Sequence, residues 1–122
     1  MRDYTEENAR ITSTSITMAD HGCLTFWLYV EGSGWGIGFG GYAIGHGYLG
    51  AKPEEFKAET GKGLEAMMQI MNAVGVEKWE DLKGKYCRCR LEGLGGGMVA
   101  IGNIIDNKWF NIRDFYDKEV KE

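Results

Sequence analysis

The chain has 122 residues, enough for one hydrophobic core and too few for two. Hydrophobic residues make up 43% of it and charged residues 26%, which is the balance of a folded domain rather than a disordered segment. The formal net charge of −4 argues against a general nucleic-acid binder, because clustered Lys and Arg supply affinity for phosphate.

Membrane and secretory segments are not expected. No apolar run reaches the roughly 18 residues of a membrane span, and the N-terminus is too polar for a signal peptide. With only three cysteines, two of them two positions apart at Cys87 and Cys89, a reducing compartment is favoured over a disulfide scaffold. We therefore expect one cytoplasmic domain over residues 1–122, with fraying at 1–9 and 117–122.

The first half of the chain predicts a three-stranded antiparallel meander. Residues 10–18 alternate and are rich in β-branched side chains, and residues 23–31 form the clearest strand pattern in the chain. A turn at 19–22 and a Gly-Ser-Gly loop at 32–34 would join these strands to a third that begins at Trp35.

The third strand lies in a glycine-rich segment, residues 32–50, in which aromatic residues alternate with glycines. In an extended chain the two-residue period gives one bulky face and one face of bare backbone. Glycine inside a strand marks a bulge or a close approach to the backbone, so we expect a ligand or a second subunit to fill the bare face. The bulky side chains are Trp35, Ile37 and Phe39, and the close-approach glycines are Gly36, Gly38 and Gly40.

The same segment also matches a dinucleotide-binding fingerprint at Gly36, Gly38 and Gly41. That motif requires a strand, a turn and then a helix at once, whereas the surroundings here predict a meander. We therefore expect no dinucleotide, no other cofactor and no metal ion.

Catalytic residues are not evident either. His21 follows Asp20 and precedes Cys23, so it could act as a base, but Asp-His-Gly is also ordinary turn chemistry. His46 is equally ambiguous. We expect no catalytic residue and a protein that is not an enzyme.

One main helix is expected over residues 63–73, ended by Gly75. Large apolar residues recur there at helical spacing and predict the buried stripe. The stripe consists of Leu64, Met67, Met68, Met71 and Val74.

After the helix, a short turn over residues 79–82 precedes two strands, at 86–92 and 98–105. The aromatic tail, residues 109–116, is expected to pack on the domain or on a second subunit. The predicted fold is α+β: an antiparallel sheet of about five strands in the order β-β-β-α-β-β, with one main helix on one face.

The uncovered face of this sheet is the candidate site. Trp27 and Tyr29 would supply stacking surface there, and Arg88 and Arg90 would hold phosphate. Hydroxyls would join them from positions 13, 15 and 17 or from 12 and 14, depending on register. The same composition is typical of a subunit interface, so both uses stay open. The full set of expected ligand-binding residues is His21, Trp27, Tyr29, Tyr42, Arg88, Arg90, Asn103 and Trp109.

Several stretches resemble a family of small uncharacterised proteins of bacteriophages and prophages over nearly the whole length. They are ITSTSITMADHG with LTFWLYVEG (11–32), GFGGYAIG (38–45), and GVEKWEDLKGKYCRCR with AIGNIIDNKWF (75–90 and 100–110). The resemblance implies a phage origin.

By analogy with other small phage proteins, that origin suggests an anti-defence sponge, a homo-oligomer that sequesters a nucleotide-like immune signal in an infected host. A protein-binding inhibitor of a host defence protein and a small nucleotide hydrolase are the alternatives.

Overall fold

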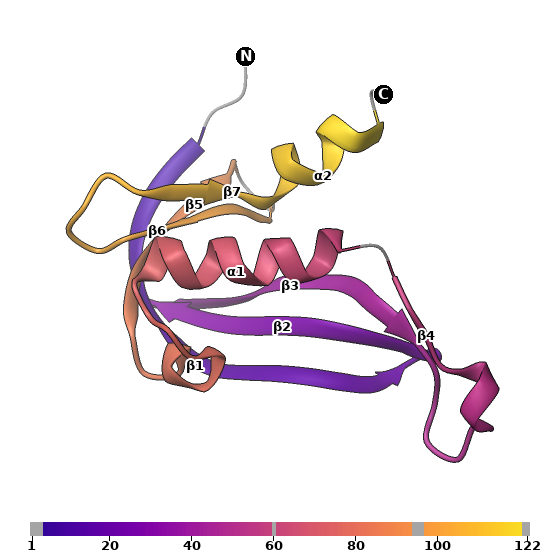
Figure 1. Cartoon of the computed structure of the whole chain (residues 1–122). Coiled ribbons are helices and arrows are strands. Elements are labelled where there is room, and N and C mark those ends of the chain that lie inside the picture. Colours follow the sequence, from indigo (N-terminus) through magenta and orange to yellow (C-terminus); the bar gives the residue numbers. More distant parts are fainter. Residues whose placement is uncertain (1–3, 60, 94–96, 121–122) are drawn as a thin grey trace.

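The computed structural model describes residues 4–59, 61–93 and 97–120. They form one antiparallel sheet that curls around the helix α1, Lys62–Val74 (Figure 1). The seven strands follow the order β4-β3-β2-β1-β5-β6-β7 across the sheet. The α+β class and the single main helix are confirmed, whereas the expected count of five strands is wrong.

Two meanders meet at the long central strand β1, Tyr4–Asp20. One side of the sheet holds β2 (Cys23–Gly32), β3 (Trp35–His46) and β4 (Lys57–Ala58). The other side holds β5 (Tyr86–Glu92), β6 (Met98–Gly102) and β7 (Trp109–Asn111). The strands β4 and β7 are the two that the sequence did not predict, because two or three residues are too few to show a period.

The ends of the chain are more ordered in secondary structure than expected. Residues 4–10 pair with β5, so the expected fraying of residues 1–9 is wrong for 4–9. The tail forms β7 and then the helix α2, Ile112–Val120, so residues 117–120 are helical in their backbone. The expected packing of the aromatic tail is confirmed, since Phe110 and Ile112 are buried in the core.

The helix α1 is confirmed, and Gly75 ends it with a φ of 100°. The buried stripe is rotated from the predicted one, because Leu64 and Met68 are exposed. The prediction counted only large apolar residues and therefore missed the small residues of the buried face. These small residues allow the helix to lie close to the sheet, since a Cβ on Gly63 would collide with Ile44. The buried positions are Gly63, Ala66, Met67, Ile70, Ala73 and Val74.

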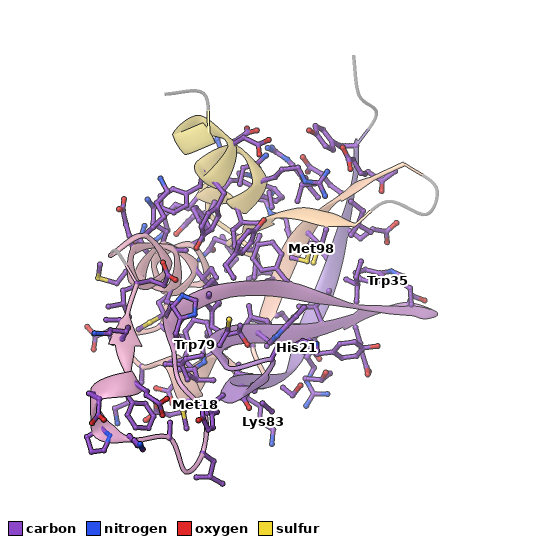
Figure 2. All side chains as sticks on the ribbon, turned by 90° about the vertical axis from the view of Figure 1, so that its right-hand side faces the viewer. Met18, His21, Trp35, Trp79, Lys83 and Met98 are labelled. Carbon is purple, nitrogen blue, oxygen red and sulfur yellow. The ribbon has the colours of Figure 1, made fainter. Side chains whose placement is uncertain are left out.

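The core fills the concave side of the sheet beneath α1. Phe26, Leu28 and Val30 of β2 are buried there, and Trp79 packs edge-on against Phe26 with ring centroids 6.0 Å apart (Figure 2). Trp79 belongs to a 3-10 turn, Trp79–Leu82, and a second such turn spans Pro53–Glu55. Among the described helices, none has the length and apolar character to cross a membrane.

Candidate binding site on the outer sheet face

The outer face is the convex face of the sheet, turned away from α1. A β-bulge at Thr12 sets which hydroxyls lie on it, since Ile11 pairs with Val30 but Ser13 pairs with Tyr29. Ser13 and Ser15 therefore share the outer face with Tyr29 and Trp27. Of the two registers left open by the sequence, the structure has the one with positions 13, 15 and 17 outward.

Gly36 and Gly38 of β3 lie on this face, as the alternating pattern predicted, whereas the prediction is wrong for Gly40, which has a φ of 111° and where a Cβ would meet the buried Phe26. Gly38 pairs with Tyr29, and Gly36 pairs with Glu31. Their bare backbone is covered by the chain itself: a Cβ at Gly36 would come within 2.5 Å of the Tyr29 hydroxyl, and one at Gly38 within 3.0 Å of the Trp27 ring. The expectation that a ligand or a second subunit fills this bare face is wrong at Gly36 and Gly38, because two aromatic side chains of the chain itself cover them.

Trp27 and Tyr29 together form an aromatic platform, the term used below for these two side chains over the β3 glycines. Trp27 remains 38% exposed and Tyr29 42% exposed, although the β3 backbone supports both rings. A hollow of about 400 Å³ lies beside them, and Ser13 and Ser15 line its floor. The platform thus presents supported ring surface and hydroxyl groups to solvent.

Arg10 is a cation of the outer face whose partner Glu31 is two residues from Tyr29 along β2, and the sequence reasoning missed it. It pairs with Glu31 on β2 and with Tyr86 on β5, and is exposed. Among the described residues, no hydrogen bond or ion pair engages its guanidinium. The only signal in the sequence was its position as the first residue of the 10–18 strand pattern, and the bulge at Thr12, which turns it to the same face as Ser13, could not be predicted.

Arg88 and Arg90 do lie on the outer face, but far from the platform. Along β1, Asn8 opposite Arg88 and Ser15 opposite Trp27 are seven residues apart, or about 20 Å. Both arginines stack on Trp109, with guanidinium carbons 4.7 and 4.0 Å from the ring centroid. The structure therefore joins three of the predicted residues into one cluster and separates them from Trp27.

Each of these arginines has five N–H donors, of which the chain itself engages two of Arg88 and one of Arg90. Arg88 donates from Nε to the Asn103 carbonyl at 2.7 Å and from Nη2 to the Asp106 carbonyl at 2.9 Å. Arg90 donates from Nε to Glu6 at 3.0 Å. Such arginines hold a loop and a strand in place, and have fewer donors left for phosphate.

Asn103 lies beside this cluster and uses its whole side chain in the fold. Its Nδ2 donates to the carbonyls of Ala73 and Val74, and its Oδ1 accepts from the backbone of Ile105 and Asp106. An amide side chain has two donors and two acceptor sites, so no hydrogen-bonding capacity remains for a ligand.

The remaining two predicted residues lie elsewhere. Tyr42 packs toward the core and stacks on Tyr116, with ring centroids 3.8 Å apart. His21 is at the tip of the turn between β1 and β2, labelled in Figure 2, with a φ of 54° beside Gly22 at 77°. Positive φ at both central residues is the signature of a type I′ hairpin turn, so Asp-His-Gly is accounted for by turn geometry.

No protein-family model matches the chain, and comparisons with curated proteins and with solved structures give no match either. Any functional conclusion therefore rests on the chemistry of the outer face.

Proposed function

We propose that this chain is a binding protein that captures a small planar anion of the nucleotide type on its outer face. A base would stack on Trp27 and Tyr29, and Arg10 would meet the anionic group in place of Arg88 and Arg90. The observation that carries the proposal is the aromatic platform, because its rings are supported by backbone yet remain about two-fifths exposed. A supported ring loses little freedom when a ligand stacks on it.

Following the resemblance to phage proteins, we propose further that the captured molecule is a nucleotide signal of a host immune system. In that role the protein sequesters the ligand without changing it. This step rests on the resemblance alone, and a homo-oligomeric state belongs to the same prediction.

The test is calorimetric titration of the protein with linear and cyclic adenine and guanine nucleotides. Stacking contributes about 1–3 kcal/mol per base, so Trp27→Ala should raise the Kd about 5- to 150-fold. Arg10→Gln should weaken binding and reduce its salt dependence. Tyr48→Ala is the matched control, since this aromatic residue is 52% exposed and lies outside the platform. Absence of heat and of a Tm shift with every nucleotide at millimolar concentration would refute the proposal.

A protein partner is the second candidate, favoured by one observation. Tyr86 is 61% exposed on the same face, next to Arg10, and extends the aromatic surface beyond the area of one base. In affinity capture from host lysate, a stoichiometric protein retained by the wild type and lost with Trp27→Ala would support this candidate over the nucleotide.

A further inference from the structure

A thiol, an imidazole and a carboxylate form a row across three strands at the other end of β2. Cys23 opens β2 and pairs with His46, which ends β3. The Cys23 Sγ lies 3.6 Å from His46 Nδ1, and His46 Nε2 contacts Glu59, just beyond β4. The backbone of Glu59 is held by a 3.1 Å hydrogen bond to the Ile44 carbonyl, so all three residues are anchored to the sheet.

This order of groups is the signature of an activated nucleophile: a base within hydrogen-bonding reach and a third group that orients the base. Glu59 accepts a hydrogen bond from the Nε2–H of His46. In that tautomer Nδ1 carries no proton, so it can accept the thiol proton of Cys23. The three groups do not surround a common point, since His46 stands between the other two. Among the described residues, no three His, Cys, Asp or Glu side chains could hold a metal ion.

Cys23 differs from the other two cysteines in its surroundings. Cys87 and Cys89 are fully buried, whereas Cys23 is partly exposed. Among the residues that the structure describes, the side-chain hydrogen-bond partner of Cys87 is the Cys89 thiol and not a base. Only Cys23 therefore combines access to solvent with a base.

An apolar hollow of about 300 Å³ adjoins His46. Met18, Leu24 and Ile44 line it from the three N-terminal strands. Phe56 closes it from the segment between the Pro53–Glu55 turn and β4, the pink ribbon near the Met18 label in Figure 2. The hollow suits a short alkyl or aryl group, and His46 borders both this hollow and the thiol.

We propose that Cys23 is the nucleophile of an acyl-transfer centre that takes a small apolar acyl group from an activated ester or thioester. His46 removes the thiol proton while Sγ attacks the carbonyl carbon. The ester C–O or thioester C–S bond breaks, and His46 returns the proton to the leaving group. Water then attacks the thioester of Cys23, giving up one proton through His46, and releases the carboxylic acid and the free thiol.

This centre goes beyond the proposed binding function and needs none of its residues. His46 and Glu59 have different roles. His46 accepts the proton of the Cys23 thiol, and Glu59 is a positioning residue that acts through the imidazole of His46. His21, the other histidine, lies on the hairpin turn and makes no hydrogen bond to Cys23 among the described residues.

The test uses the full chain with p-nitrophenyl butyrate. The wild type should release p-nitrophenolate and carry a butyryl group on Cys23, detected by peptide mass spectrometry, while Cys87 and Cys89 stay unmodified. General acid–base catalysis contributes about 10²- to 10⁴-fold, so His46→Gln should slow the acylation of Cys23 by that factor. His21→Gln is the matched control and should react at the wild-type rate.

Glu59→Gln should slow the acylation of Cys23, because an amide does not stabilise the imidazolium that forms on His46, and Glu59→Asp should restore part of the rate. A merely structural role would give no such recovery, and an unchanged Tm shows that each variant folds. An acyl group absent from Cys23, or equal rates for the wild type and His46→Gln, would overturn the proposal. The acylation assay contains no nucleotide and the nucleotide titration involves no acyl donor, so the failure of either proposal does not decide the other.

Discussion

At the scale of single residues, glycine and aromatic side chains are matched across neighbouring strands. The Trp27 ring lies over Gly38 of β3, and the Trp109 ring of β7 lies over Gly102 of β6, where a Cβ would come within 2.7 Å. Each glycine removes a side chain at the point where a large ring crosses the strand. Gly38 and Gly102 are thus explained by packing within the sheet, and the aromatic rings they support are what remains for a partner.

The buried cysteines predict a pH dependence of stability. The hydrogen bond with Cys87, followed by burial, raises the pKa of the Cys89 thiol above its ordinary value. A raised pKa in the folded state means that stability is fully present below the ordinary thiol pKa of about 8.5 and falls as the pH rises above it.

We expect Cys89→Ala to flatten this loss. In urea unfolding between pH 7 and 10.5, the wild type should lose up to about 1.4 kcal/mol more per pH unit above 8.5 than the variant. The two proteins differ only at position 89, so the difference between the two curves reports the Cys89 thiol. Parallel curves would contradict the expectation.

At the scale of elements, Asn103 connects the end of α1 to the β6–β7 loop by four hydrogen bonds. Asn103→Ala should leave two carbonyls at the helix end without their side-chain donor and two loop amides without an acceptor. An unmet buried polar group costs about 1–3 kcal/mol, so a loss of roughly that size or more is expected in chemical unfolding.

The companion variant Asn107→Ala is the control, since this exposed residue of the same loop makes no side-chain hydrogen bond among the described residues. Equal stability of the two variants would show that the Asn103 bonds do not hold the helix end. An unchanged nucleotide Kd in Asn103→Ala would support its structural role over the ligand contact first expected of it.

Changes in strand register explain most of the residue pairings that could not be predicted from the sequence. With Gly32 opposite Trp35, uninterrupted pairing would put Cys23 opposite Ile44, yet two extra residues in β3 put it opposite His46. One of these bulges lies at Gly40 and Gly41, whose φ angles are 111° and 84°. The strands and the alternation of β2 could be predicted from residue types, whereas bulges change the partner of every residue beyond them.

At the scale of the whole molecule, the predicted ligand set divides because β1 is much longer than expected. Its second half pairs with β2 and its first half pairs with β5. The outward side chains of β2 and β5 therefore lie on the same face of the sheet but at different positions along β1. The sequence correctly predicted which side chains point outward on β2 and β5. Their distance apart depended on which part of β1 each strand pairs with, and no local pattern carries that information.

The separation of the two clusters predicts additive effects on stability. Trp27→Ala and Trp109→Ala lie on regions about 20 Å apart with no shared partner, so their losses should add within about 0.5 kcal/mol in the double variant. Denaturant unfolding of the two single variants and the double variant measures this directly. A larger coupling energy would mean that the clusters act as one unit, as the sequence first suggested.

The shared central strand also sets the order in which the molecule can be assembled. Tyr4 of β1 pairs with Glu92 of β5, so the first part of β1 is paired by a segment far along the sequence. On a ribosome the hairpins of β1, β2 and β3 can close early, since their partners are near in sequence. Residues 4–10 have an unpaired strand edge until β5 has been synthesised. During that interval the nascent chain is most prone to mispairing.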